Sequence, residues 1–492
     1  MKIQITIDNK LRMDTKNIPQ AILKKIKNEL STINPEYLKF LKRGKRAVWL
    51  DEKINHYWES DGIISMPRGF INNLQEILKP YKPQYSVKDI TMKFPKINIK
   101  IKKSKDDWEF QNKALGKIEK KEFGIIVFPT GAGKTITAIK TICLRKQPTL
   151  IVVHTKLLLH QWKEKILQFT NIEEDKIGLI GDGKKELGEY ITIGIVNSLG
   201  KVVDNIKNEF GMLIIDECHR TPASTFSKVA SRINSYYILG LTATPKRSDG
   251  QSNMINFYCG NIIEKIEPKV IQETGKIMIP KLIIRKTGFT PSNEEKDDQS
   301  PYKDFKYKIG KTYLREAKNI PAIFKTELNF FESPKESTNY MKILSEIVIN
   351  ENRNNLIKND VIDYLKNNKN GVALVISDRI EHCNILFSEL SKIVKTDLLT
   401  SKTKETFKDS RIIVATSQLI GEGFDCPKLS ALFLTTPISW QYRLIQYVGR
   451  ILRIEKGKDS AIIYDYLDDS ELCYRMFERR KPGYRKQGIK NI

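Results

Sequence analysis

The sequence predicts an α/β protein with two tandem parallel-sheet domains and a small accessory domain in front of them. Strands that are buried on both faces of a parallel sheet read as short, uninterrupted apolar runs, and the chain contains two sets of such runs. The first set lies at 124–128, 149–153, 191–196, 212–215 and 237–241. The second set lies at 280–285, 372–377, 412–415, 431–435 and 461–465. A glycine-rich loop between the first of these strands and a helix-like stretch is the third observation.

The glycine-rich loop, residues 129–135, reads Pro-Thr-Gly-Ala-Gly-Lys-Thr. Such a loop presents backbone N–H groups and a helix N-terminus to phosphate oxygens, with Lys134 at the β- and γ-phosphates and the Thr135 hydroxyl on Mg²⁺. Phe128 stands where the general pattern has its first glycine, but Gly131 and Gly133 keep the positions where the backbone approaches phosphate. ATP and Mg²⁺ are therefore the expected cofactors. The expected phosphate-binding residues are Thr130, Gly131, Ala132, Gly133, Lys134 and Thr135.

Two acidic residues, Asp216 and Glu217, follow the strand expected at 212–215. Phosphoryl transfer depends mostly on positioning and charge neutralisation. We therefore expect Asp216 to hold Mg²⁺ through water, and Glu217 to orient and deprotonate the attacking water. Acidic residues also commonly follow a strand before a turn, and the glycine-rich loop upstream is what favours the catalytic interpretation.

The tetrapeptide 216–219, Asp-Glu-Cys-His, is a variant of the Asp-Glu-x-His box, and from here the chain resembles helicase superfamily 2. Further matches follow in that family's order at 241–245, 371–379, 416, 421–425 and 446–453. The string 245–250, Pro-Lys-Arg-Ser-Asp-Gly, is similar to the branch of XPB and UvsW, which are double-stranded DNA motors. The resemblance covers roughly residues 105–470 and implies two RecA-like domains with ATP in the cleft between them.

The segment 446–453 is similar to the family's arginine-finger helix. Gln446, Arg450 and Arg453 are spaced by four and three residues, so a continuous helix places them on one face. Two guanidinium groups there can neutralise charge on the transferred phosphoryl only if a second domain closes on the nucleotide, because the phosphate loop lies about three hundred residues away. The expected catalytic residues are Glu217, Asp216, Lys134, Gln446, Arg450 and Arg453.

The resemblance implies roles for three more groups of residues. Nucleotide contacts beyond the phosphate loop are implied for Gln111, which would read the adenine edge, and for Gly421 and Asp425. Coupling of the ATP state to the grip on nucleic acid is implied for His219, Thr242 and Thr244. Nucleic-acid contacts are implied for Thr155, Lys156, Asn197, Ser198, Arg247, Ser377, Arg379 and Thr416. Arg247 and Asp249 are implied either to act at the duplex or to form a conformational salt bridge. Gln161 and Trp162 resemble a motif that holds the sugar-phosphate backbone, but for Trp162 a core position is favoured.

The charge of the chain is strongly positive and unevenly placed. The 84 Lys and Arg against 58 Asp and Glu give a net charge of +26. Residues 1–105 carry 23 basic against 10 acidic side chains, and residues 474–492 carry 7 against 1. Such a surface suits a polyanion, and with helicase-type motifs the expected polyanion is nucleic acid, above all double-stranded or branched DNA. A lysine-rich composition from an AT-rich coding genome is the alternative explanation.

The motifs and the charge together suggest the domain boundaries. Residues 1–95 are expected to form a basic accessory domain that binds nucleic acid, packs on the motor or docks a partner. Residues 96–275 and 276–470 are expected to form the first and second RecA-like domains. Residues 290–338 interrupt the second domain with a segment that grips a duplex or docks a partner protein. Residues 471–492 are expected as a basic tail, in which 479–490 either clamp phosphate or are disordered, with disorder as the default for a terminal charge run.

Other functional classes lack support in the sequence. The six cysteines form no Cys-x-x-Cys pair, which argues against a zinc ribbon or an iron–sulfur cluster. The five histidines form no pair with acidic residues of the kind that a fused metal-dependent nuclease needs. Residues 1–10 are too polar for a signal peptide, and no run approaches the roughly eighteen apolar residues of a membrane helix. A soluble, cytoplasmic protein with no membrane partner is expected.

The expected function is that of an ATP-dependent helicase or translocase acting on duplex, forked or branched DNA. Two alternatives stay open. One is an RNA helicase or transcript-release motor, because phosphate contacts do not distinguish the two polymers unless a 2′-OH is read. The other is an ATPase subunit of a larger nucleic-acid defence, repair or transcription complex, with protein partners at the accessory domain or at 290–338.

Overall fold

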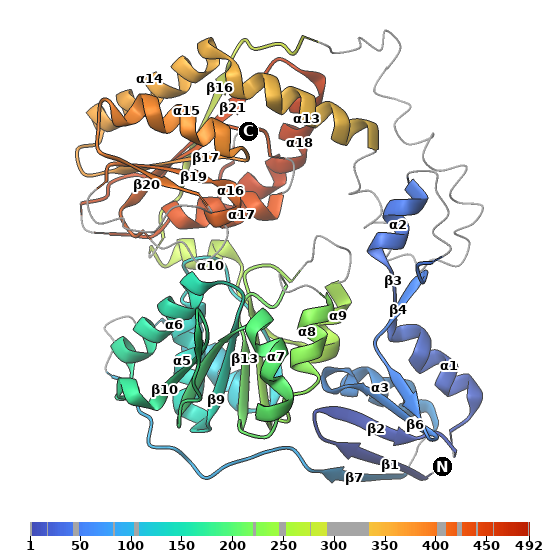
Figure 1. Ribbon diagram of the computed structural model, residues 1–492. Helices are drawn as coiled ribbons and strands as arrows, with labels where there is room; N and C mark the ends of the chain where they lie inside the picture. The colour runs from blue at the N-terminus through green and yellow to red at the C-terminus, as the bar shows by residue number, and fades with distance from the viewer. Residues whose placement is uncertain are drawn as a thin grey trace.

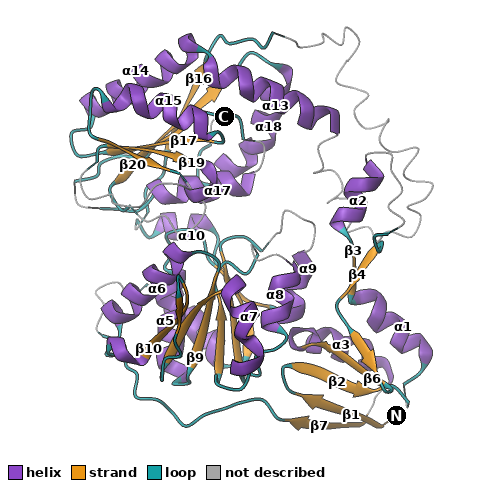
Figure 2. Cartoon of the chain, viewed as in Figure 1, coloured by secondary structure: helices purple, strands orange, loops and turns teal. Residues whose placement is uncertain are grey.

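Two parallel-sheet domains and a smaller N-terminal domain make up the computed structural model (Figure 1). The structure describes residues 2–16, 18–42, 49–81, 84–102, 108–219, 223–245, 252–275, 277–292, 334–400, 410–420, 426–438, 441–455, 457–490 and 492. Figure 2 shows helices on both sides of the strands in each sheet domain, so the predicted α/β class with tandem parallel sheets is confirmed. Among these residues, no helix combines the length and the apolar character that crossing a membrane requires.

The first sheet domain contains an eight-stranded sheet in the order β11-β10-β12-β9-β13-β14-β8-β15, in which only the β10–β11 pair is antiparallel. The five strands expected here are present, and their ends differ from the prediction by at most one residue. Its elements are α4 (Glu109–Glu119), β8 (Phe123–Val127), α5 (Lys134–Arg145), β9 (Thr149–Val153), α6 (Lys156–Phe169), β10 (Ile177–Gly181), β11 (Lys184–Lys185), β12 (Ile191–Ile195), α7 (Val196–Ile206), β13 (Met212–Ile215), α8 (Ala223–Ala230), β14 (Tyr237–Thr242), α9 (Ser252–Cys259), β15 (Ile262–Lys265) and α10 (Pro268–Glu273).

Three strands of this sheet, β10, β11 and β15, are absent from the sequence-based prediction. β15 reads Ile-Ile-Glu-Lys and lies at the edge of the sheet, where its ends are exposed. Because an edge strand is not buried on both faces, its apolar run is only two residues long and gives a weak strand signal. β10 reads Ile-Gly-Leu-Ile-Gly, and the glycines weaken the strand signal although the strand is buried throughout. β11 is a two-residue return strand after a turn.

The second sheet domain contains a six-stranded sheet in the order β16-β21-β20-β17-β19-β18, with all neighbouring strands parallel. The five strands expected here are present, with ends within two residues of the prediction, and β18 is an addition to it. Its elements are β16 (Lys281–Lys286), α13 (Pro334–Ile349), α14 (Glu351–Asn367), β17 (Val372–Ser377), α15 (Ile380–Ser391), β18 (Thr396–Leu399), β19 (Ile412–Thr416), α16 (Ser417–Ile420), β20 (Leu429–Leu434), α17 (Gln441–Ile451), β21 (Ile462–Leu467) and α18 (Glu471–Lys486).

The basic C-terminal segment is a packed helix, so the default expectation of disorder is wrong for residues 479–486. α18 buries an apolar face and contacts α17. Arg480 within it is 1% exposed and donates to both carboxylate oxygens of Asp465, at 2.7 and 2.8 Å, while the Tyr484 hydroxyl donates to the same carboxylate. One of the counted positive charges is therefore neutralised inside the domain and does not face solvent.

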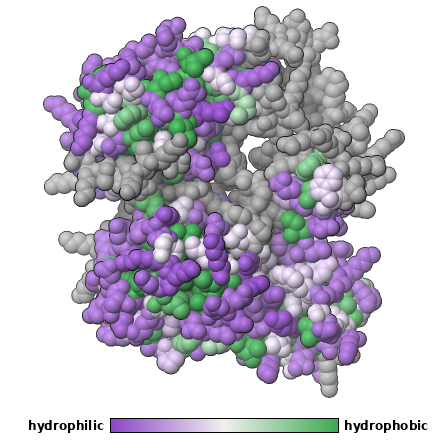
Figure 3. Space-filling model, viewed as in Figure 1, coloured by the Kyte–Doolittle hydropathy of each residue, from purple (hydrophilic) through white to green (hydrophobic). Residues whose placement is uncertain are grey.

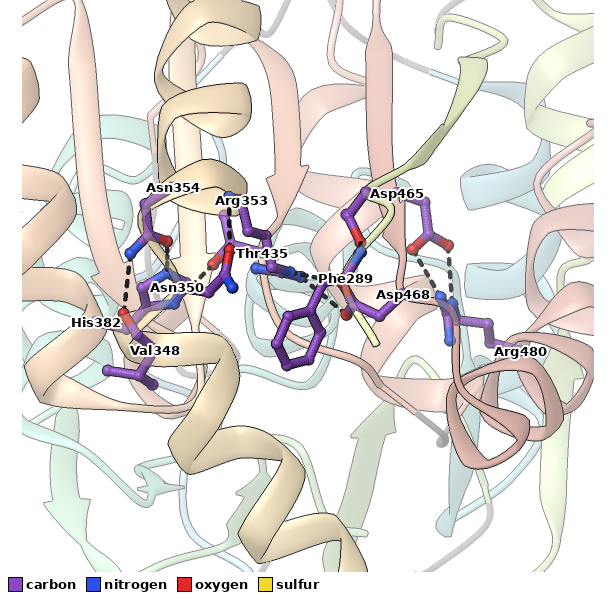
Figure 4. Close-up of polar contacts among 11 residues, drawn as sticks. Phe289, Val348, Asn350, Arg353, Asn354, His382, Thr435, Asp465, Asp468 and Arg480 are labelled. Carbon is purple, nitrogen blue, oxygen red and sulfur yellow. Dashed lines mark hydrogen bonds and ion pairs between the residues drawn. The ribbon is translucent and has the colours of Figure 1, made fainter. Parts of the chain in front are cut away.

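The interrupting segment leaves the second domain close to a buried ion pair. Residues 293–333 lie outside the described residues, and α13 begins at Pro334, within the range expected for the interruption. On the near side, the carbonyl oxygen of Phe289 accepts from the backbone N–H of Asp469 at 2.8 Å. Figure 4 shows Arg353 of α14 donating to the neighbouring Asp468, at 2.7 and 3.2 Å, with both side chains fully buried. Phe289, shortly before the segment begins, is therefore held against the residues that follow β21.

The N-terminal domain contains a five-stranded sheet in the order β5-β6-β2-β1-β7, with β1 and β7 parallel and the other pairs antiparallel. Figure 1 shows a two-stranded ribbon, β3 and β4, that carries α2 away from this sheet. The elements are β1 (Lys2–Ile7), β2 (Lys10–Asp14), α1 (Gln20–Glu29), β3 (Ser31–Ile33), α2 (Pro35–Lys42), β4 (Lys53–Asn55), β5 (Trp58–Ser60), β6 (Ile63–Pro67), α3 (Ile71–Leu78) and β7 (Gln84–Asp89).

The N-terminal domain packs on the first sheet domain through a shared core. Arg68 is 5% exposed and donates to the carbonyl oxygens of Ser235 and Tyr236, the second at 3.0 Å. The His56 ring lies 5.5 Å from the Phe257 ring of α9, measured between centroids. Buried apolar residues of the two domains form one continuous cluster. The accessory domain is therefore attached to the first sheet domain and is not a separate body on a linker.

Replacing Gly69 by alanine tests this shared core. The added Cβ would lie 2.4 Å from both the Asn256 carbonyl oxygen and the Gly260 nitrogen, and these backbone atoms can yield only if α9 moves. We expect Gly69→Ala to lower the free energy of unfolding by about 1–3 kcal/mol, measured by urea denaturation followed by circular dichroism.

Gly116→Ala in α4 is the matched control for that substitution. It places its Cβ with nothing within 4 Å at an exposed helix position, so it should stabilise the chain by up to about 1 kcal/mol. Unchanged stability of the Gly69 variant would contradict the shared core.

Candidate active site

The phosphate loop connects β8 to α5 at the carboxyl edge of the first sheet. Gly131 and Gly133 have φ of 87° and 76°, values that only glycine adopts without strain, and α5 begins at Lys134. The ammonium of Lys134 lies 3.3 Å from the Phe128 carbonyl oxygen and 3.6 Å from a carboxylate oxygen of Glu217. The loop therefore presents backbone, a helix N-terminus and one lysine around a single point, which fits a phosphate chain.

Asp216 directly follows β13 and is 6% exposed. One carboxylate oxygen accepts from the backbone N–H of Glu217 at 2.9 Å, and the other accepts from the indole N–H of Trp162 at 2.8 Å. Burial and the adjacent Glu217 raise the pKa of Asp216 to about 6, while the Trp162 hydrogen bond and Lys134 oppose that rise. Together with the Thr135 hydroxyl, this carboxylate supplies the oxygen donors that a hard cation such as Mg²⁺ prefers.

Glu217 has an unusual backbone conformation. Its φ is 45°, in the left-handed region that a non-glycine residue enters only where the surrounding structure imposes it. This turn directs the carboxylate to Lys134 on one side and to His219, whose Nδ1 lies 3.3 Å away, on the other. A general base for a phosphate-bound water needs such placement next to the phosphate loop.

His219 connects the two sheet domains. Its Nδ1 lies 2.8 Å from the Thr242 hydroxyl, and its Nε2 lies 3.4 Å from the Gln446 amide nitrogen of α17. The Thr242 hydroxyl donates to the Thr244 carbonyl oxygen at 2.6 Å. Because the Thr242 hydroxyl uses its hydrogen in that bond, it can only accept from His219. The contacts therefore fit a neutral ring in which Nδ1–H donates to Thr242 and Nε2 accepts from Gln446. The three residues expected to couple the site are thus one hydrogen-bonded chain that ends in the second domain.

The second domain approaches the phosphate loop through α17 and the residues after it. A Cβ on Gly449 would lie 2.5 Å from the Thr130 Cβ, so the helix and the loop are in direct contact. A Cβ on Gly131 would lie 3.9 Å from the Arg453 Cγ. The structure therefore brings Arg453, one of the two predicted arginines, to the loop from the other domain. The second, Arg450, lies in the last turn of α17.

Arg453 is not on the helix, and this corrects the prediction of a shared helical face. α17 ends at Ile451, and Arg453 forms an isolated antiparallel bridge with Ile277. The helix stops because its last carbonyls have other donors: the Lys458 ammonium donates to the carbonyl oxygens of Ile451 and Arg453 at 2.6 Å each, and Met278 N–H donates to Leu452. Burial lowers the pKa of Lys458 to about 8. Backbone pairing therefore sets the position of Arg453.

Gln111, the predicted adenine reader, is 2% exposed and packs under the phosphate loop. Its amide nitrogen donates to the Ala132 carbonyl oxygen at 3.2 Å, and its amide oxygen accepts from the Lys140 ammonium at 3.4 Å. A Cβ on Gly133 would lie 2.3 Å from that amide nitrogen. The contacts in the structure support the loop, and the adenine contact stays a prediction.

Four of the residues predicted to contact nucleic acid lie at one edge of the first sheet. β12 and β9 are neighbours with Ile195 opposite Val153, so the segments that follow them begin side by side. Lys156, at the start of α6, is exposed and forms an ion pair with Asp182 at 2.6 Å. Thr155 accepts from Leu158 N–H and thereby caps α6, while Asn197 and Ser198 lie in the first turn of α7.

Ser377, also predicted to contact nucleic acid, is completely buried. Burial lowers the pKa of His382 to about 3, so its ring is neutral; Nε2–H donates to Asn354 at 2.9 Å (Figure 4) and Nδ1 accepts from the Ser377 hydroxyl at 3.1 Å. The hydroxyl also accepts from Arg379 N–H. The Ser377 side chain therefore orders the turn after β17 and does not face a ligand. Thr416, at the end of β19, is likewise buried.

Several predicted residues lie outside the described residues: Arg247 and Asp249 in the string after β14, and Gly421 and Asp425 after α16. Two contacts of the site escaped the sequence analysis. For Trp162 the sequence favours a core position over a nucleic-acid contact, and nothing in one sequence reveals that its N–H donates to Asp216. Lys458 lacks a motif of its own, although a lysine shortly after a helix end is a known pattern for capping carbonyls.

Known proteins resemble this chain over most of its length. The family described as type III restriction enzyme, res subunit, matches residues 78–247. The DNA 3′-5′ translocase XPB2 of Sulfurisphaera tokodaii is 29% identical over 402 residues, which cover 80% of this chain and 87% of that protein. The XPB/SSL2 helicase/translocase subunit of general transcription and DNA repair factor IIH from Saccharomyces cerevisiae is 30% identical over 221 residues, 41% of this chain and 26% of that protein.

Among solved structures, the DNA-bound ATP-dependent type ISP restriction-modification enzyme LlaBIII superposes with a TM-score of 0.50 at 14% identity, over 81% of this chain and 32% of that one. This likeness concerns the fold. The two RecA-like domains, the phosphate loop and the helix that meets it from the second domain define a motor ATPase of helicase superfamily 2. Within it, the chain is similar to the XPB translocases, and it is an ATP-hydrolysing enzyme.

A Gly449→Ala variant tests the contact between the domains. In a helix interior this change should favour the helix by up to about 1 kcal/mol, but here the new methyl group would displace Thr130 of the phosphate loop. We expect the turnover number for ATP to fall about 10- to 100-fold, because misplacement of the second domain by about 1 Å removes its arginines from the phosphates. The measurement is steady-state ATPase.

Gly200→Ala in α7 provides the control, since its Cβ meets nothing within 4 Å. Turnover in Gly200→Ala should equal that of the wild type. Full turnover in Gly449→Ala would show that the two domains do not need this contact.

Proposed function

We propose that the chain is an ATP-dependent DNA helicase or translocase that acts on duplex, forked or branched DNA. The observation that carries this proposal is the convergence of both RecA-like domains on the phosphate loop, with Gly449 against Thr130 and Gln446 near His219. A nucleotide bound there contacts both RecA-like domains. Gain or loss of its γ-phosphate therefore changes the distance between the two domains. The relative named as a DNA 3′-5′ translocase supports DNA as the track.

In the hydrolysis step, the chain's own residues position the nucleotide and the attacking water and neutralise charge on the phosphates. Lys134 and the backbone N–H groups of the loop bind the β- and γ-phosphates. Glu217, held between Lys134 and His219, orients the attacking water and accepts its proton. Arg450 and Arg453 approach from the second domain and neutralise charge on the transferred phosphoryl.

Thr135 and Asp216 are the residues that would hold Mg²⁺. Thr135 lies in the first turn of α5, and Asp216 follows β13, two strands away from β8 in the sheet. The ion would neutralise negative charge on the phosphate oxygens. The described residues contain no group of three or more His, Cys, Asp or Glu that could hold a metal ion without the nucleotide.

The DNA contacts that we propose lie on two parts of the molecule. One is the edge formed by Lys156 and Asn197, because both are exposed at the carboxyl ends of neighbouring strands. The other is the arm of the N-terminal domain, formed by β3, α2 and β4. There Trp49 is 73% exposed and lies edge-on to Phe40, with 5.7 Å between the ring centroids. Exposed aromatic rings beside basic residues suit nucleic acid. Hydrophilic side chains cover most of the described surface seen in Figure 3.

A second candidate is an ATPase subunit that works only within a larger assembly. The yeast relative, whose name makes it a subunit of a transcription and repair factor, favours this possibility. In that case we expect the isolated chain to hydrolyse ATP slowly with every nucleic acid, and to respond when its partner is added.

Steady-state ATPase with a panel of nucleic acids tests the proposed function. Wild type, Lys134→Ala and Glu217→Gln are compared without nucleic acid and with single-stranded, duplex and forked DNA and with RNA, at one fixed salt concentration. We expect strong stimulation by duplex or forked DNA. Loss of a phosphate-binding charge or of the general base should reduce turnover by about 10²-fold or more.

Lys201→Ala is the matched control for Lys134→Ala, because Lys201 is exposed on α7. Its turnover should equal that of the wild type. Stimulation by RNA alone would favour the RNA motor, and stimulation by none of the polymers would favour the partner-dependent subunit. Turnover that survives both active-site substitutions would overturn the assignment of the site.

A further inference from the structure

Trp162 makes a polar contact that its place in the core does not require. Its side chain is 1% exposed and belongs to a buried apolar cluster that extends from the first sheet domain into the second. The indole N–H nevertheless ends on a carboxylate oxygen of Asp216, at 2.8 Å. A neutral core residue thus contacts the carboxylate that the proposed function assigns to Mg²⁺.

The packing of α6 holds the indole ring in this position. β9 lies beside β13, with Ile215 opposite Val152, and the backbone N–H of Asp216 donates to the Val152 carbonyl oxygen at 3.0 Å. α6 begins three residues after β9 and returns across the sheet, so its seventh residue, Trp162, reaches the end of the adjacent strand. Leu159 and Ile166, on the same side of α6, are fully buried. The ring therefore cannot turn away without opening the core.

The hydrogen bonds determine how the Asp216 carboxylate is oriented. One oxygen accepts from Glu217 N–H and the other from Trp162, so rotation of the carboxylate would break at least one of two buried bonds. Each oxygen keeps a further lone pair, which is free to face a ligand. Residues that orient metal-binding carboxylates in this way commonly change metal affinity by about 10- to 100-fold when they are replaced.

A simpler explanation is that Asp216 merely satisfies a buried indole N–H, since tryptophan in a core needs an acceptor. The two explanations differ in what is lost when the N–H is removed. If the bond serves packing alone, stability falls and nucleotide binding changes equally with and without Mg²⁺. If the bond orients Asp216, the loss is confined to the part of nucleotide affinity that Mg²⁺ contributes.

We propose that Trp162 is a positioning residue for the metal-binding carboxylate: its indole N–H holds Asp216 in the orientation that receives the Mg²⁺ of the bound nucleotide. This inference rests on the proposed function, because that function assigns Asp216 to the metal. Trp162 itself contacts neither nucleotide nor metal and acts through Asp216.

The test compares nucleotide affinity with Mg²⁺ and with EDTA in the full chain. Binding of a fluorescent ADP analogue is titrated for wild type and Trp162→Phe, which keeps an aromatic ring and removes the N–H. The ratio of the dissociation constants in EDTA and in Mg²⁺ measures the contribution of the ion. We expect this ratio to fall about tenfold in Trp162→Phe, with the dissociation constant in EDTA changed less than twofold.

Ile166→Val is the control, because it removes one methylene from the same buried side of α6 and touches no polar group. Its ratio should equal that of the wild type. If Trp162→Phe does not fold, benzothienylalanine in place of Trp162 exchanges the N–H for sulfur at nearly constant shape and serves as the second measurement. A wild-type ratio in whichever Trp162 replacement folds would overturn the inference alone. A wild type that binds the nucleotide without any gain from Mg²⁺ would overturn the metal assignment in the proposed function as well.

Discussion

The contact between α17 and the phosphate loop is the constraint on which the rest of the molecule depends. Because Gly449 has no side chain, the helix lies directly against Thr130. At this distance the Gln446 amide reaches His219, which also contacts Glu217. Glu217, the proposed general base, is therefore joined to the second domain through protein contacts. A nucleotide bound at the loop would join the two domains a second time. A change at the γ-phosphate can then alter how the two domains meet.

Each domain is stiffened on its own side of this contact. The N-terminal domain and the first sheet domain share a core, with buried Arg68 donating to backbone carbonyls across the boundary. In the second domain, the buried pairs Arg353–Asp468 and Arg480–Asp465 hold α14 and α18 to the end of β21. Such pairs are costly to break, because the remaining charge would be buried without a partner. Stiff domains convert a small change at the nucleotide into movement between them and not within them.

The sequence predicts those parts of the molecule that depend on local patterns. Continuous apolar runs predict ten strands, and the glycine-rich loop predicts the cradle around Lys134. Features set by tertiary packing are not predictable in this way: Arg453 lies beyond the end of its helix because distant backbone groups bind the last carbonyls, and the hydrogen bond from Trp162 to Asp216 exists only once α6 lies over the sheet. Charge in the last residues also conceals the apolar face of α18.

The central claim is that one nucleotide is held by both RecA-like domains. The most direct measurement is a structure of the full chain with Mg²⁺, ADP and beryllium fluoride, which mimics the γ-phosphate. The account predicts that the fluoride group contacts Lys134 from the first domain and Arg450 or Arg453 from the second. A mimic bound by the first domain alone, with both arginines directed elsewhere, would contradict it.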